Sequence, residues 1–143
     1  MRRFFEPART GVLSTLSRDG YPHSVAMWFV PELGSADGEL RMWAYRKSQK
    51  VVNLERDPRC ALMVEEGTAY NELRGILVQG RARIVDDPEE VYDIGRRLYE
   101  IYTLPATEVP AAAAEDELRR QAGKRKGIVL PLDCVASWDH GKL

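Results

Sequence analysis

The sequence contains few of the residues that build metal centres and disulfide frameworks. Its 143 residues include two cysteines, Cys60 and Cys134, and two histidines. These four residues do not easily close a structural zinc site, and no Ser-His-Asp, Cys-His or metal-ligand spacing is present. We therefore expect no metal site, and we expect both cysteines to be reduced thiols in the core of a cytoplasmic protein.

Long apolar segments and an excess of one charge are also missing. No apolar run approaches the roughly 20 residues that a membrane-spanning helix needs, and the first seven residues lack the apolar core of a signal peptide. A net charge of -1 gives no general attraction to nucleic acid or to an anionic membrane. With 44% hydrophobic residues, the chain is expected to form one domain, residues 1–143, around its own core.

Segments rich in β-formers predict strands along most of the chain. They cover residues 10–17, 23–30, 39–45, 59–65, 73–85 and 127–138. Asp19-Gly20 predicts a tight hairpin turn, Pro31 is expected to end the second strand, and residues 34–38 are expected to form a loop. Gly75 and Gly80 predict bends or a bulge inside the longest strand, which would let a sheet curl.

Three helices are predicted between these strands. One begins at Ser48 and ends before Pro58. A second begins at Asp87 with a proline at its first helical position, and a third covers residues 111–122, after an irregular segment over residues 104–110. The hairpin connections argue against a parallel α/β sheet and favour a mainly β fold, an antiparallel β-barrel with flanking helices. Because side chains fill a small barrel, a large cofactor would bind outside it, against a second subunit.

A basic turn joins the third predicted strand to the first helix. Arg46, Lys47 and Lys50 lie around the start of this helix, where Ser48 is the predicted N-cap. The unpaired N–H groups and the positive dipole end of a helix already favour an anion, and three cations would strengthen the binding of a phosphate. The turn therefore predicts a site for a phosphorylated cofactor, although the same charges could also form a solvated helix start.

Three segments occur in a characteristic order, residues 13–29, 48–59 and 73–82, and residues 137–143 close the chain. Together they resemble the FMN-binding split β-barrel family, typified by pyridoxamine 5′-phosphate oxidase, and especially its actinobacterial flavin and deazaflavin oxidoreductase branch. The resemblance implies an antiparallel split β-barrel that is dimeric. It also implies that the cofactor lies at the interface of a homodimer.

The resemblance also assigns roles to individual residues. Contacts along the flavin or deazaflavin ring would come from Val25, Ala26, Met27 and Trp28, and contacts near the ribityl phosphate from Ala44 and Tyr45. The phosphate would be held by Ser48, Gln49 and Lys50, where Gln49 replaces an arginine of the oxidases, together with Arg46 and Lys47. Apart from the resemblance, the position of Arg74 in or beside a loop makes it the polar residue expected to contact the cofactor or substrate across the dimer.

Besides Gln49, two further departures from the oxidases affect the expected activity and substrate. Gly75 stands near the position of a flavin-contacting glutamine, and Trp138 is followed by His140 and Lys142 with no arginine. These departures argue against an ordinary pyridoxamine phosphate oxidase. The cofactor is expected to be coenzyme F420 or FMN. The pair Lys47 and Lys50 favours F420, and Arg46 or Arg41 could meet the carboxylates of its polyglutamate tail.

The expected activity is hydride transfer between this cofactor and a small conjugated molecule. The cofactor carries the chemistry, so no strong acid–base constellation is required. Solvent, Tyr45 and Tyr70 are the candidate proton donors, and no catalytic residue is assigned. An alternative is a non-enzymatic protein that binds or carries a flavin, haem or tetrapyrrole, and a third is a dimeric interaction module without a cofactor.

Overall fold

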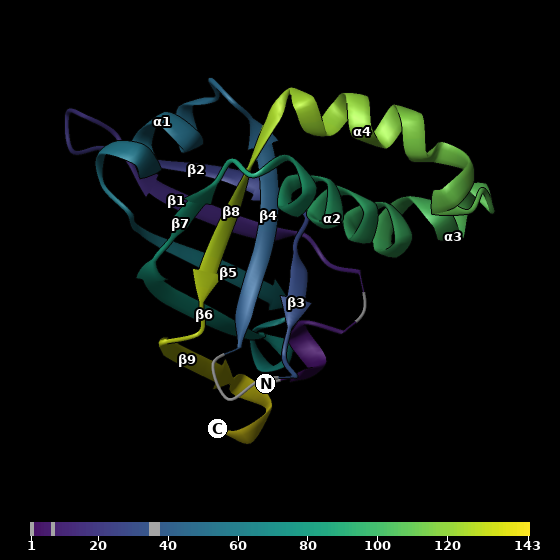
Figure 1. Ribbon diagram of the computed structural model, residues 1–143. Coiled ribbons are helices and arrows are strands. Elements are labelled where there is room, and N and C mark those ends of the chain that lie inside the picture. The colour runs from purple at the N-terminus through teal and green to yellow at the C-terminus, as the bar shows by residue number, and fades with distance from the viewer. Residues whose placement is uncertain (1, 7, 35–37) are drawn as a thin grey trace.

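Two antiparallel sheets cross one another in the computed structural model, which describes residues 2–6, 8–34 and 38–143 (Figure 1). The first sheet has the order β2 (Pro22–Met27), β1 (Gly11–Leu16), β5 (Arg59–Glu66), β6 (Arg74–Arg81) and β9 (Cys134–Asp139). The second has the order β3 (Val30–Glu32), β4 (Glu39–Tyr45), β8 (Arg125–Pro131) and β7 (Arg83–Val85). The mainly β, antiparallel split-barrel fold predicted from the sequence is confirmed.

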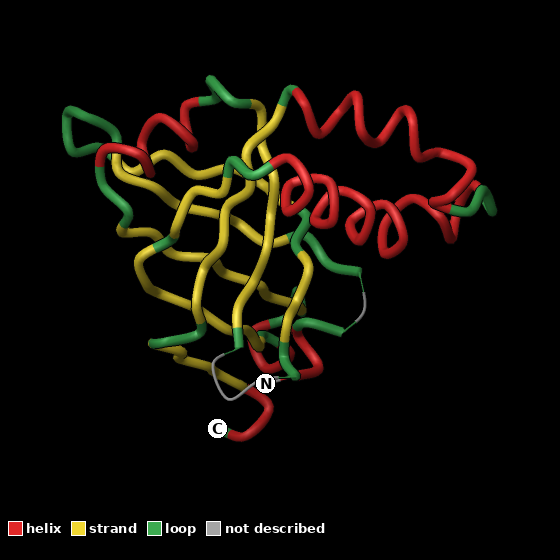
Figure 2. Tube along the Cα trace, viewed as in Figure 1, coloured by secondary structure: helices red, strands yellow, loops and turns green. Residues whose placement is uncertain are grey.

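The core lies between the inner faces of the two sheets, whose strands cross in Figure 2. Strand residues alternate between the two faces of a sheet, so every second residue of the central strands points into this core. The fully buried side chains on these faces include Leu13, Leu62, Ile76, Leu40, Met42, Ile128 and Leu130. The barrel interior is therefore filled, and a cofactor has to bind outside it.

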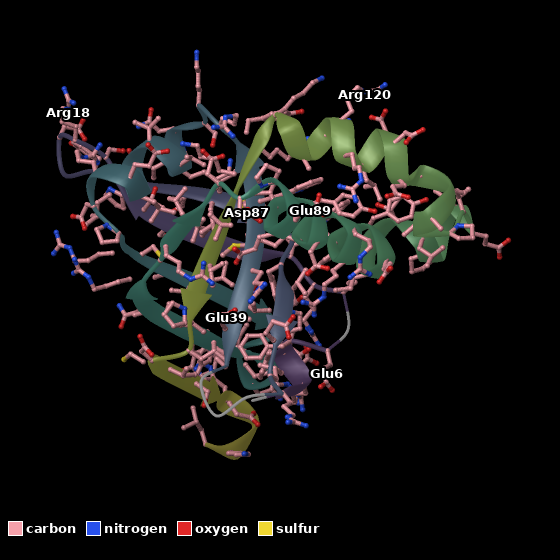
Figure 3. The ribbon with its side chains drawn as sticks, in the orientation of Figure 1. Glu6, Arg18, Glu39, Asp87, Glu89 and Arg120 are labelled. Carbon is pink, nitrogen blue, oxygen red and sulfur yellow. The ribbon has the colours of Figure 1, made fainter. Side chains whose placement is uncertain are left out.

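Four α-helices and several shorter turns connect the described strands. They are η1 (Arg2–Phe4), α1 (Gln49–Arg56), η2 (Tyr70–Glu72), α2 (Pro88–Leu98), η3 (Tyr99–Thr103), α3 (Leu104–Thr107), η4 (Ala111–Ala114), α4 (Glu115–Gly123) and η5 (His140–Lys142). The Asp87 carboxylate accepts a hydrogen bond from the N–H of Glu90 (3.0 Å), which confirms the predicted start of α2 (Figure 3). Helices α2 and α4 pack together beside β4 and β8 (Figure 1).

Three long predicted strands are each divided in two. Residues 23–30 are divided between β2 and β3, residues 73–85 between β6 and β7, and residues 127–138 between β8 and β9. In each case the two halves belong to different sheets, because the chain turns a corner of the barrel there. The prediction that Pro31 ends a strand is wrong: Pro31 lies within β3, an edge strand, where a proline needs no ladder partner on its open side.

The structure also corrects several smaller predictions. The predicted helix over residues 111–122 begins as a 3₁₀ turn and becomes α-helical only at Glu115, and residues 104–107 are helical rather than irregular. Both cysteines are free; Cys60 is half-buried and packs against the core, whereas Cys134 is not a core residue but lies exposed on the edge strand β9. Residues 35–37 of the predicted loop lie outside the described residues.

Candidate cofactor site

A groove of about 370 Å³ lies on the outside of the barrel, where the ends of β2 and β4 meet α1 and α2. We call it the outer groove; it is lined by Ala26, Met27, Trp28, Trp43, Ala44, Tyr45, Lys50, Leu98 and Arg125. Its volume is within the range of small-molecule sites in proteins. The structure thus brings residues 26–28 together with Ala44, Tyr45 and Lys50, which the family resemblance assigns to one cofactor, whereas residues 46–49 do not line the groove.

The first wall of the outer groove is the end of β2. Side chains alternate along this strand, so Ala26 and Trp28 are exposed while Met27 is buried. Val25 packs against the core and does not line the groove, although its backbone lies on the same strand. Trp28 is 50% exposed, and its other face stacks on Tyr102, with ring centroids 4.6 Å apart and planes 3° from parallel.

The opposite wall is the end of β4, where two aromatic side chains hold an arginine. The guanidinium of Arg125 lies 4.7 Å from the ring centroid of Trp43 and 4.3 Å from that of Tyr45. Tyr45 and Arg125 are register partners in the pairing of β4 with β8, and Arg125 also donates to the carbonyl of Gln121 (3.1 Å). Sequence analysis missed Arg125 as a site residue, because only strand pairing brings it beside Tyr45.

The start of α1 carries two polar groups for which the described residues provide no partner. Ser48 occupies the N-cap position, but its side chain makes no capping bond, and its hydroxyl oxygen is buried without a hydrogen-bond partner. Lys50 is half-buried and has no ion pair within residues 2–6, 8–34 and 38–143, and burial lowers its pKa. A phosphate would supply acceptors for both groups, so these residues fit a phosphorylated cofactor.

The other members of the predicted phosphate cluster are placed differently. Arg46 donates to both carboxylate oxygens of Asp86 (2.5 and 2.9 Å), and this contact lowers the pKa of Asp86. Gln49 donates to Asn53 (2.7 Å), and Lys47 is exposed outside the outer groove. Arg41, the other candidate for the cofactor's carboxylates, is bound to Glu39.

Arg74 lies apart from the outer groove. It lines a second cavity of about 360 Å³ together with Arg3, Trp138 and Lys142, and its Nε lies 3.3 Å from a carboxylate oxygen of Glu66. Within one chain, Arg74 therefore does not reach the groove. Of the two tyrosines considered as proton donors, Tyr45 lines the groove, while Tyr70 packs against His140 (4.6 Å between ring centroids).

Metal-binding and membrane-spanning features are also absent from the described part of the chain. No group of three or more His, Cys, Asp or Glu side chains is arranged to hold a metal ion there. None of the described helices has the length and apolar character needed to cross a membrane.

Comparison with known proteins places this geometry in a family. The pyridoxamine 5′-phosphate oxidase family model matches residues 1–130. A conserved hypothetical protein from Mycobacterium tuberculosis has a similar structure, with a TM-score of 0.84 and 37% identity over 98% of this chain and 82% of that chain. An F420 reductase is similar with a TM-score of 0.69 and 28% identity, over 94% of both chains.

More distant structures share the fold alone. A heme storage protein from Vibrio cholerae superposes with a TM-score of 0.69 at 16% identity, over 94% of this chain and 89% of that chain. A search of curated proteins finds no match. Since the family match spans nearly the whole chain and the sheets form a split barrel, this protein belongs to the pyridoxamine 5′-phosphate oxidase family.

Proposed function

We propose that this protein is an oxidoreductase that binds the deazaflavin coenzyme F420, or FMN, in the outer groove and transfers a hydride between the cofactor and a small conjugated molecule. The observation that carries the proposal is the pair of unpartnered groups at the start of α1. The Ser48 hydroxyl is buried without a partner, and the Lys50 ammonium is half-buried beside the groove. Leaving the buried Ser48 hydroxyl unsatisfied is costly, and the charge of Lys50, unpaired among the described residues, lies two residues further on, so the two groups together favour a bound anion.

The lining of the outer groove combines charged and apolar surface. Lys50 and Arg125 contribute two cations, whereas Ala26, Trp28 and Leu98 contribute apolar side chains. A cofactor that carries both a phosphate and a flat ring matches this combination. The ring supplies the hydride when it is bound, and the chain's own residues orient it and exclude water. Tyr45 is the candidate proton donor, because its phenol lies in the groove.

The choice of F420 over FMN has two supports. The chain is 28% identical to an F420 reductase over 94% of its length. Lys47 is exposed next to the groove with no ion pair among the described residues, so it is available to carboxylates beyond the phosphate. Arg46 is less available, because Asp86 holds it through two hydrogen bonds.

The proposal includes a homodimer, with the outer face of the first sheet as the interface. On that face the strand registers align an apolar row across five strands: Ala26, Val12, Met63, Leu77 and Ala136. Each of these side chains is at least partly exposed in the single chain. A contiguous apolar face of this kind marks an interaction surface. A partner there could bring its Arg74 to the edge of the groove.

The first test is cofactor binding by the purified protein. F420 and FMN are titrated separately, followed by cofactor absorbance and by thermal shift, since a ligand that binds the native state raises the melting temperature. We expect micromolar or tighter affinity for one of them. Lys50→Ala should weaken it by about 10-fold to 100-fold, because a charge-assisted hydrogen bond contributes roughly 1.5–3 kcal/mol. Unchanged binding by this variant would contradict the proposed site.

Lys47→Ala is the matched control, since Lys47 is three residues away but outside the groove. It should change the affinity for FMN little, because FMN has no carboxylate tail. A second assay offers quinones and nitroaromatic compounds to the reduced cofactor on the protein. Tight binding without turnover of any such acceptor would instead indicate a carrier.

A further inference from the structure

Trp28 owes its position in the outer groove to a residue far away in the sequence. The Tyr102 ring stacks on Trp28 nearly in parallel, with centroids 4.6 Å apart and planes 3° from parallel. Trp28 itself is half-exposed, so one face of the indole lies against Tyr102 while the side chain still borders the groove. Trp28 and Phe29 lie between β2 and β3, outside either strand, where no sheet ladder holds the backbone.

Hydrogen bonds to the Tyr102 hydroxyl hold the backbone at this break, where the sheet ladder provides none. The hydroxyl accepts a hydrogen bond from the N–H of Phe29 (3.2 Å) and donates to the carbonyl of Arg9 (2.8 Å), with the Phe29 carbonyl as a second acceptor at 3.1 Å. Burial raises the pKa of Tyr102, so the hydroxyl stays protonated and able to donate. One side chain therefore fixes both the backbone beside Trp28 and the plane of its ring.

The local backbone around Tyr102 is itself unusual. Tyr102 lies in η3, a π-helical turn that continues α2. Such turns are rare and frequently occur at functional sites. Here the turn carries Tyr102 across to the strand break, while Leu98, at the end of α2, lines the same groove.

We infer that Tyr102 is a positioning residue: it holds the Trp28 indole as a rigid wall of the outer groove, against which a flat ring binds. The inference rests on the proposed function for the identity of that ring. It also makes a prediction for the free protein, because the stacking and the hydroxyl contacts involve residues of this chain alone.

A double-mutant cycle tests the inference through cofactor affinity. FMN and F420 are titrated into the wild type, Tyr102→Leu, Trp28→Leu and the double variant. We expect Tyr102→Leu to raise the Kd by about 3-fold to 10-fold, a factor equivalent to one lost aromatic pair. In the Trp28→Leu background the same substitution should change the Kd by less than about twofold, because the wall is already gone. An equal change in both backgrounds would overturn the inference.

A second readout does not depend on any cofactor. The near-ultraviolet circular dichroism of the free protein should lose the same band in Tyr102→Leu and in Trp28→Leu. Tyr99→Leu is the matched control, because Tyr99 lies in the same turn but bonds to the Val109 carbonyl (2.7 Å) and should leave the band unchanged. A band that persists in Tyr102→Leu would overturn the inference, even if neither cofactor binds and the proposed function fails.

Tyr102→Phe is the control for the possibility that Tyr102→Leu fails to fold. This variant keeps the ring and removes only the hydroxyl that anchors Phe29. It should raise the Kd by at least about twofold when Trp28 is present and not in the Trp28→Leu background, since the loss of one hydrogen bond weakens the anchor. A penalty that is independent of Trp28 would show a purely structural role.

Discussion

At the scale of single residues, the proposed anion site depends most on the environment of Lys50. Its ammonium is half-buried, no described acidic group pairs with it, and burial lowers its pKa below the ordinary value for lysine. Ser48 adds a hydroxyl that has lost contact with water without gaining a partner. The Ser48 hydroxyl is buried and the Lys50 ammonium is partly desolvated, so a phosphate would gain their hydrogen bonds at a reduced further cost of desolvation.

The lowered pKa of Lys50 predicts a pH-dependent affinity. A bound phosphate favours the charged ammonium and raises this pKa again. Binding therefore takes up a proton at any pH between the pKa of the free protein and that of the complex, so affinity falls as the pH rises through this interval. Cofactor titrations from about pH 7 to about pH 10 should show the fall beginning at a lower pH than for an ordinary lysine.

Lys50→Arg provides the control for this dependence, because a guanidinium stays charged throughout the range. Its affinity should be nearly independent of pH, whatever its absolute value. A fall of the same size in Lys50→Arg would assign the titration to the cofactor or to another group.

Cys60 should be an unreactive thiol. Burial raises the pKa of Cys60 to about 11, and the thiolate is the reactive form. At about pH 8 roughly one thiol in a thousand would be ionised. In a Cys134→Ser variant, which leaves Cys60 as the remaining cysteine, Ellman's reagent should react very slowly with the native protein and stoichiometrically after unfolding. Rapid reaction of the native protein would contradict the burial of Cys60.

At the scale of elements, the contact between α2 and β4 shapes the outer groove. Gly95 lies on the face of α2 that meets Trp43, and a β-carbon at this position would lie 2.1 Å from the Trp43 ring. The missing side chain lets the helix approach the strand closely. Trp43 in turn stacks on Arg125 and lines the groove, so the closeness of the helix affects the site.

Gly95→Ala should therefore destabilise the protein, although alanine favours a helix by about 1 kcal/mol over glycine. Overpacking against a rigid indole typically costs about 1–3 kcal/mol, and we expect it to outweigh the gain in helix propensity. Thermal unfolding should show a melting temperature lower by several degrees, about 3–8 °C. Gly123→Ala is the control, because no atom lies within 4 Å of its β-carbon position, and it should be neutral or stabilising.

At the scale of the whole molecule, the two faces of the first sheet have different roles. The inner face carries fully buried residues such as Leu13, Leu62 and Ile76, which pack against the second sheet. The outer face carries the apolar row of Ala26, Val12, Met63, Leu77 and Ala136, and α2 and α4 lie over the other sheet instead (Figure 1). One end of this row, Ala26, also lines the outer groove, so dimerisation and cofactor binding are expected to be coupled.

This coupling predicts the behaviour of Leu77→Arg. A buried charge at the centre of an apolar interface is costly unless it is paired, so the variant should be monomeric. Size-exclusion chromatography with light scattering measures the change, and far-ultraviolet circular dichroism checks that the fold is kept. Val109→Arg, at an exposed apolar residue away from this face, should leave the dimer intact. A wild type that is already monomeric would refute the proposed interface.

Local sequence patterns were sufficient for much of the secondary structure. Alternation and turn residues predicted β1, β4 and β5 closely, and the Asp87 cap predicted the start of α2, because these features depend on residues a few positions apart. The family resemblance further indicated residues 26–28, 44–45 and 50 as groove residues, and they do line one groove. Whether a cofactor binds them stays a prediction.

Other features depend on contacts between distant parts of the chain, which no local pattern records. Closure of the barrel decides where a long strand leaves one sheet for the other, so the local pattern predicts one continuous strand over each of residues 23–30, 73–85 and 127–138. Asp86, 40 residues away in the sequence, forms an ion pair with Arg46. Strand register places Arg125 in the groove, and a π-helical turn places Tyr102 against Trp28. Interactions between residues close in the sequence thus specified the helices and strands, and contacts between distant residues decided which side chains line the outer groove.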